Sequence, residues 1–376
     1  MLPKATMNEY THAMSAALIA DPNELQRLCE RVRDAPWIAL DTEFMRVNTY
    51  RARLCLIQLA TPDLIACVDP LALADLAPLL DLLYRADVLK VLHAARQDLE
   101  VFADIRGVPP QPVFDTQIAA ALLGHEDQIG YGALVQKITG HKLDKVEART
   151  DWAVRPLSDA QVRYAEDDVR YLRDVYTAMR AQLREREDWL TQECAALTDP
   201  ALYRNDPHDA WRRLGAGASL SPAQQSSLVA LAAWREREAQ SRNSPRGWIV
   251  PDNALIALAR MQPESATELG QIADLKPGMI RRDGAALLRV IKEAREQPIK
   301  TYWEPIDRLT PEQSALVKRL SAAVQERART ANISATLVAS RRELVRLVRG
   351  DTGGMLLQGW RRQFIGEELL RQIDAT

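Results

Sequence analysis

Short apolar segments alternate with helical patterns over the first half of the chain. Helical spacing of leucines and other apolar residues marks 71–84 and 96–105, the second of which is closed by Gly107. Five other segments are short and rich in apolar side chains, as strands are: residues 37–44, 53–60, 64–69, 88–93 and 113–115. Because the first three lie close together and helices separate the later ones, we expect an α/β domain with a mixed sheet that begins as a meander.

Helical patterns replace strand patterns after residue 120. Ser158 with Gln161 three residues on is a capping box, which predicts the start of a long helix. Two later helical segments resemble each other in their opening residues, Leu220-Ser221-Pro222 and Leu309-Thr310-Pro311. We therefore predict a first domain, a linker rich in Pro and Gly, and two all-α helical-bundle modules: residues 1–200, 201–217, 218–298 and 299–376.

The composition is that of an ordinary globular protein with more than one domain. Of 376 residues, 47% are apolar and 27% charged. No apolar run approaches the ~20 residues that span a bilayer, so we expect no membrane partner. The four cysteines are far apart and form no Cys-x-x-Cys pair, which disfavours a zinc site and favours reduced thiols in the cytoplasm.

Charge is distributed unevenly along the chain. Residues 211–376 hold 26 Lys and Arg against 18 Asp and Glu, a net +8, so residues 1–210 carry −10. The acidic half would need cations before a polyanion could approach, whereas the basic half could hold that polyanion nearby. The alternative is that the additional arginines only solvate helix faces.

Two carboxylates close the first strand. Asp41 and Glu43 are two residues apart at the end of 37–44, so their side chains share one face of the sheet. Asp-x-Glu at a strand end is common and often only a solvated edge. Here it follows Ile38-Ala39-Leu40, a run apolar enough to be buried, which makes a site more plausible.

Two further carboxylates lie on predicted helices, one in a first turn and one on a helix face. Asp98 falls in the first turn of the helix after the strand 88–93, where the helix dipole alone would also favour an acid. Tyr164 and Asp168 are four residues apart and project from one helix face. Asp168 has no arginine at that spacing, unlike its acidic neighbours, although an acid-rich surface helix is the alternative.

Four carboxylates brought together cannot all stay ionised unless cations neutralise them. Hard divalent cations with oxygen ligands are the natural partners, and Mg²⁺ is typically bound by carboxylates together with substrate phosphates. The set therefore indicates metal-dependent cleavage of a phosphodiester.

These segments resemble the DEDD exonuclease superfamily, in the subgroup whose third motif is Tyr-x-x-x-Asp, and within it bacterial ribonuclease D. The segments after residue 215 resemble the helicase-and-RNase-D C-terminal (HRDC) module, of which this family can carry two. The resemblance covers nearly the whole chain, and its most specific parts lie in five segments: residues 39–59, 115–117, 143–145, 149–152 and 155–157.

The resemblance implies a ribonuclease-H-like 3′→5′ exoribonuclease that uses two divalent ions, Mg²⁺ or Mn²⁺, and no organic cofactor. It would trim RNA 3′ ends, tRNA precursors among them, and release nucleoside 5′-monophosphates. Asp41 would bridge the ions, and Glu43 and Asp168 would hold the one that activates water. Asp98 would support the second ion through its waters, and Tyr164 would position the attacking water.

Softer candidates would contact the substrate. Phe44, Tyr50 and Trp152 could stack on terminal bases, although core packing is the simpler role for Phe44. The other five candidates are Thr42, His93, Lys145, Arg149 and Arg155. The alternative for the histidine is a structural role, and the alternatives for the three basic residues are helix capping and ion pairing.

Two other functions stay open from the residues alone. One is a 3′→5′ DNA exonuclease of the proofreading or repair type. The other is a non-catalytic nucleic-acid-binding protein, against which the intact carboxylate set argues, because unneutralised acids would repel a phosphate backbone.

Overall fold

The structure is a computed structural model, and it describes residues 18–143, 150–303 and 308–375. The chain divides into two compact units, each built from segments far apart in the sequence. The sheet unit comprises Met1–Met45, Leu54–Tyr203 and Leu309–Thr376, and the helical unit comprises Arg46–Arg53 and Arg204–Arg308. The candidate carboxylates all belong to the sheet unit.

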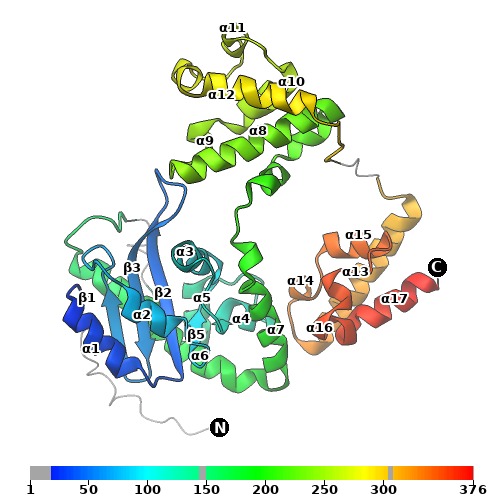
Figure 1. Cartoon of the computed structure of the whole chain (residues 1–376). Helices are drawn as coiled ribbons and strands as arrows, with labels where there is room; N and C mark the ends of the chain where they lie inside the picture. Colours follow the sequence, from blue (N-terminus) through cyan, green and yellow to red (C-terminus); the bar gives the residue numbers. More distant parts are fainter. Residues whose placement is uncertain (1–17, 144–149, 304–307, 376) are drawn as a thin grey trace. The chain divides into compact units, whose positions relative to one another are not determined.

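A mixed sheet of six strands forms the centre of the sheet unit (Figure 1). Its strand order is β1-β4-β3-β2-β5-β6. β3 and β4 pair antiparallel, whereas β2–β5, β5–β6 and β1–β4 pair parallel, so the expected mixed sheet is confirmed. The strands are β1 (Leu18–Ile19), β2 (Trp37–Met45), β3 (Arg53–Thr61), β4 (Leu64–Val68), β5 (Leu89–Leu92) and β6 (Val113–Asp115).

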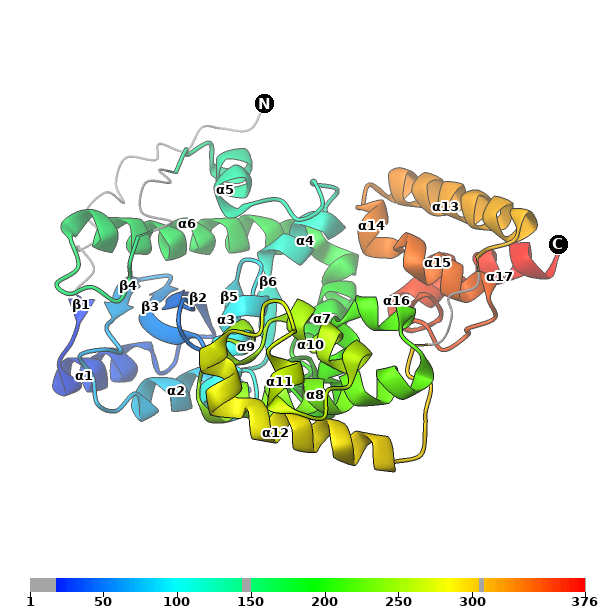
Figure 2. The ribbon, with the colours of Figure 1, turned by 90° about the horizontal axis from the view of Figure 1, so that it is seen from above.

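Helices cover both faces of this sheet. Figure 2 shows the long helix α6 along one face and α1 and α2 along the other. The expected capping box is present, because Ser158 accepts from Gln161 N while the Gln161 side chain accepts from Ser158 N. These helices are α1 (Pro22–Val32), α2 (Ala77–Leu83), α3 (Arg96–Arg106), α4 (Thr116–Leu122), α5 (Tyr131–Thr139), α6 (Asp159–Leu183) and α7 (Glu187–Leu197).

The last part of the chain packs on α4 and α7 and shares their hydrophobic core. Trp189 of α7 stacks on Trp360, with ring centroids 4.6 Å apart. Glu193 accepts from both the Trp360 indole, at 2.7 Å, and the buried guanidinium of Arg361. This segment folds as α13 (Pro311–Ala331), α14 (Ala335–Val338), α15 (Arg341–Val348), α16 (Gly359–Arg361) and α17 (Glu367–Asp374).

The helical unit packs α8 against α10 and α12 around its own core. Ala210 and Leu214, within the residues that we expected to form a linker, are buried in that core. Residues 46–53 also belong to this unit, where Tyr50 contacts Glu236 and Arg246. The helices are α8 (Pro222–Ser241), α9 (Arg246–Ile249), α10 (Asp252–Met261), α11 (Ala266–Leu269) and α12 (Pro277–Glu296).

The helical segments after the sheet agree with the expected fold class, whereas the exact domain boundaries stay a prediction. Within the described residues, no helix is both long and apolar enough to cross a membrane.

Candidate active site

Strand β2 places two of the predicted carboxylates at the edge of the core. Ile38, Ala39 and Leu40 are fully buried, which fixes the strand, and Asp41 and Glu43 follow at alternate positions. Alternation turns both of these side chains to one face of the sheet. Thr42 lies between them, and its hydroxyl donates to Asp98 Oδ1 at 2.5 Å.

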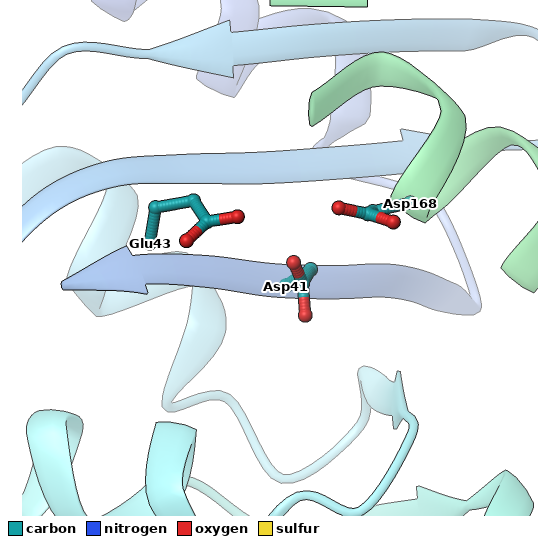
Figure 3. Close-up of side chains that lie close together, drawn as sticks. All are labelled: Asp41, Glu43 and Asp168. Atoms are coloured by element: carbon teal, nitrogen blue, oxygen red, sulfur yellow. The ribbon is translucent and has the colours of Figure 1, made fainter. Parts of the chain in front are cut away.

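Helix α6 supplies the third carboxylate of the cluster. Carboxylate oxygens of Asp41, Glu43 and Asp168 all lie within 4.8 Å of one another. Figure 3 shows these three side chains converging on the same space from β2 and α6. The acidic neighbours of Asp168 are paired instead, because Arg170 binds Glu166 at 3.0 Å and Asp167 at 3.2 Å. Helical i,i+4 spacing predicts Arg163 as the partner of Asp167, but the structure pairs Asp167 with Arg170.

A cavity of about 890 Å³ surrounds this cluster. Its lining includes all five residues that we predicted to be catalytic: Asp41, Glu43, Asp98, Tyr164 and Asp168. Asp98 is not part of the three-carboxylate group, but it is buried and bonded to Thr42 at the end of the same strand. The cavity lining also includes the apolar side chains of Phe44, Ile118 and Leu172.

Two residues that sequence reasoning did not select hold this arrangement in place. Asp115, at the end of β6, accepts from Ala94 N at 3.1 Å and from Ala95 N at 2.8 Å, and so fixes the turn that leads into α3 and Asp98. The Tyr131 hydroxyl donates to the backbone carbonyl of Asp168 at 2.5 Å. Asp115 lies in the segment 115–117, which contributed to the resemblance, but no local pattern predicts these contacts, because the partners of both residues are far away in the sequence.

Burial and mutual repulsion disfavour ionisation throughout the cluster. Burial, followed by the charges of Asp98 and Asp168, raises the pKa of Asp41 well above its usual value. Burial and then Asp41 and Asp98 raise the pKa of Glu43 to about 9. The pKa of Asp168 is also raised well above the ordinary range, by burial and then by Glu43. Burial raises the pKa of Asp98 to about 6.

This donor set fits hard divalent cations. Three carboxylates that repel one another in a shared, partly buried space are stabilised when positive charge is bound between them. The donors are oxygen only, which suits Mg²⁺ or Mn²⁺ better than softer metals. Burial, followed by Asp168, Glu43 and Asp41, also raises the pKa of Tyr164, so its hydroxyl is suited to hydrogen bonding rather than to proton abstraction.

Of the other predicted substrate contacts, two lie in the wall of the cavity and two fall outside the described residues. Thr42 and His93 line the cavity. The ring of His93 is held by Thr116 Oγ1 and the Ile129 carbonyl, both at 3.0 Å, which gives it a structural role as well. Lys145 and Arg149 lie outside the described residues.

Arg155 is engaged with protein groups. It binds the buried carboxylate of Asp69 at 2.6 and 2.8 Å and donates to the carbonyls of Cys55, Trp152 and Val154. Its contacts favour the structural alternative of an ion pair. The stacking candidates differ too, because Trp152 is buried in the core while Phe44 lines the cavity.

Comparison with known proteins identifies the family. The 3′-5′ exonuclease model matches residues 17–184, and the HRDC domain model matches residues 224–291. Ribonuclease D of Acidiphilium cryptum is 41% identical over 363 residues, which cover 94% of this chain and 92% of that protein. The chain belongs to the ribonuclease D family. Ribonuclease D of Pseudomonas paraeruginosa is 38% identical, over 95% of this chain and 97% of that protein.

A solved ribonuclease D shares the fold over nearly the full length. The crystal structure of Escherichia coli RNase D aligns with a TM-score of 0.87 and 34% identity, covering 96% of this chain and 99% of that one. As a ribonuclease D, the chain is a 3′→5′ exoribonuclease and a hydrolase. Neither the DNA exonuclease nor the non-catalytic alternative agrees with this family.

Proposed function

We propose that this ribonuclease D trims the 3′ ends of structured RNAs, tRNA precursors among them, with two divalent cations, and releases nucleoside 5′-monophosphates. The observation that carries the proposal is the group of three carboxylates within 4.8 Å inside a cavity large enough for a terminal nucleotide. The Escherichia coli relative is described as an exoribonuclease involved in structured RNA processing, which supports the substrate class.

Each residue of the site then has a task. Asp41, Glu43 and Asp168 would hold the cations, with Asp98 adding negative charge in the same cavity. When bound, divalent cations lower the pKa of a water and stabilise the charge that develops on the leaving 3′-oxygen. Tyr164 orients the attacking water through its protonated hydroxyl, and Thr42 keeps Asp98 in place through the 2.5 Å hydrogen bond.

The cytoplasm is the proposed location. All four cysteines are free thiols, and three of them are buried, as suits a reducing compartment. RNA precursors are also made there.

The test combines turnover with direct measurement of metal binding. Wild-type protein is incubated with Mg²⁺ or Mn²⁺ and a 3′-extended tRNA, the same tail as single-stranded RNA, and its DNA counterpart, and nucleotides are separated by chromatography. We expect nucleoside 5′-monophosphates from both RNAs and far less product from DNA. Equal or faster release from DNA would contradict the proposed substrate.

Variants test whether the clustered carboxylates, and not their acidic neighbours, are needed for turnover and metal binding. Asp41→Asn and Asp168→Asn should abolish turnover and lower the number of Mn²⁺ ions bound in titration calorimetry. Asp167→Asn is the matched control, because Asp167 is adjacent in sequence but is paired with Arg170. If Asp168→Asn keeps near-full activity, the assignment of the site is wrong.

A further inference from the structure

The cavity that holds the carboxylate cluster also contains one cationic side chain. Asp115 adds a fifth carboxylate to the four that we assigned to the metal site, whereas Arg96 is the only lysine or arginine among the described residues of the lining. A substrate phosphate that enters this cavity therefore meets a single positive charge supplied by the protein itself. None of the tasks assigned above to the site uses this arginine.

Arg96 is exposed, and its side chain forms no hydrogen bond or ion pair with any group in the described part of the chain. Asp98 lies in the same helical turn, but residues two apart on a helix do not face each other. Glu100 has the spacing of a helical ion pair with Arg96, yet these two described residues form none. Arg155, by contrast, is fully engaged with protein groups. The guanidinium of Arg96 is thus available to an anion from outside.

The backbone that carries Arg96 is rigid. Ala95 before it and Leu99 after it are fully buried, and Leu99 N donates to the Ala95 carbonyl at 2.9 Å to close the first turn of α3. Asp115 holds the preceding turn by accepting from Ala94 N and Ala95 N. A side chain on a fixed backbone loses less conformational freedom when it binds a ligand, so this arginine is well placed to select one position of a strand.

Arg96 lies on a different part of the cavity wall from the carboxylate cluster. Burial raises the pKa of Tyr203 to about 12, and the charge of Arg96 opposes this rise, so the two side chains are neighbours. The Tyr203 hydroxyl donates at 2.7 Å to the carbonyl of Leu197, the last residue of α7, which also lines the cavity. The clustered carboxylates come instead from β2 and α6. One cavity therefore offers two separate places for phosphate.

We propose that Arg96 is a substrate-binding residue that holds the RNA phosphate next to the one that is cut. This inference rests on the proposed function and deepens it. The 3′-terminal nucleotide is joined to the strand by one phosphate only, the scissile one, which lies at the carboxylates and their cations. A second phosphate in the cavity must then belong to the next linkage on the 5′ side.

The chemistry of arginine suits this task. Its planar guanidinium can donate two parallel hydrogen bonds to one phosphate, and it stays charged at every pH at which the enzyme is folded. Contacts to phosphate fix the register of a strand without reading its sequence. Arg96 would thus place the terminal linkage at the carboxylates whatever the bases are, as a trimming enzyme requires.

RNA with one neutral linkage tests which phosphate Arg96 binds. We use a five-nucleotide single strand in which a methylphosphonate replaces either the second or the fourth linkage from the 3′ end, while the first linkage stays an ordinary phosphodiester. Release of the terminal nucleotide is followed in single turnovers with Mg²⁺. For the wild type, a neutral second linkage should raise the half-saturating protein concentration about tenfold, as loss of one hydrogen bond between charged groups does, and a neutral fourth linkage should change it little.

Variants show whether that loss belongs to Arg96. Arg96→Ala should bind the unmodified RNA about tenfold more weakly, with a salt slope smaller by roughly 0.7, and should lose nothing further when the second linkage is neutral. Arg96→Lys keeps the charge and should recover part of the affinity. Arg106→Ala is the matched control, because this arginine of the same helix pairs with Asp81 and does not line the cavity.

Two results would overturn the assignment. One is an Arg96→Ala protein that binds unmodified RNA as tightly as the wild type. The other is a neutral second linkage that weakens this variant as much as it weakens the wild type. Failure of the proposed function looks different, since the wild type would then release no nucleoside 5′-monophosphate from unmodified RNA. The same comparison of variants and linkages would then be made on RNA affinity alone, by fluorescence anisotropy.

Discussion

Glu43→Gln should make the metal-free enzyme more stable at neutral pH while abolishing its activity. In the folded protein, burial and the charges of Asp41 and Asp98 raise the pKa of Glu43 from 4.5 to about 9. The folded state therefore holds a proton that the unfolded state has lost, and wild-type stability falls as pH rises from about 4.5 towards about 9. Glutamine keeps the shape of the side chain but never carries the charge.

The size of the effect follows from the same shift. At pH 7.5 the pH lies three units above the ordinary pKa, and each unit corresponds to about 1.4 kcal/mol, which gives an upper bound of about 4 kcal/mol. The side chain is only partly buried, so solvent screens some of the repulsion, and we expect about 2 kcal/mol. That difference should raise the apparent melting temperature by roughly 5 °C.

Thermal unfolding in EDTA between pH 5 and 8.5 measures this difference. The variant and the wild type should converge at pH 5 and separate as pH rises. Added Mn²⁺ should stabilise the wild type strongly at pH 7.5 and Glu43→Gln much less, because the variant lacks one of the three clustered carboxylates. Melting curves that stay parallel across this pH range, or equal stabilisation by Mn²⁺, would refute the repulsion that we infer for the cluster.

Three further variants test other contacts of the sheet unit. Tyr131→Phe removes the hydroxyl that fixes the Asp168 carbonyl, so kcat should fall several-fold and more Mn²⁺ should be needed for half-maximal rate, while KM for RNA stays constant. Arg361→Met leaves the partly buried Glu193 without its cation and should cost about 3 kcal/mol in urea unfolding; a loss below 1 kcal/mol would show that the ion pair is not structural. Arg155→Met should lower the melting temperature but not KM for RNA, and a raised KM would return this arginine to the substrate contacts.

Local signals predicted the strand and the helix that carry three carboxylates of the candidate site. Asp41 and Glu43 follow a run of residues that is apolar enough to be a buried strand, and Asp168 lies one helical turn after Tyr164. The capping box at Ser158 set the start of α6 correctly, and Gly107, with φ of +81°, ends α3 as expected. Each of these signals depends on neighbours within four residues, which a single sequence displays.

Other features depend on partners far away in the chain. Asp115 and Tyr131 act through backbone groups of distant residues, so nothing beside them in the sequence marks their role. Tyr50, which we considered as a stacking residue, instead hydrogen-bonds to Glu236 in the helical unit. Helix α1 is a different case, because Asp21 caps it and Pro22 is its first residue, a start signal that we did not use.

The two-part construction of the sheet unit has a consequence for its synthesis. Residues of α13 to α17 complete the hydrophobic core that α4, α6 and α7 begin, so the nuclease body is unfinished until its final segment has left the ribosome. A nascent or prematurely ended chain would expose that apolar surface and be open to proteolysis.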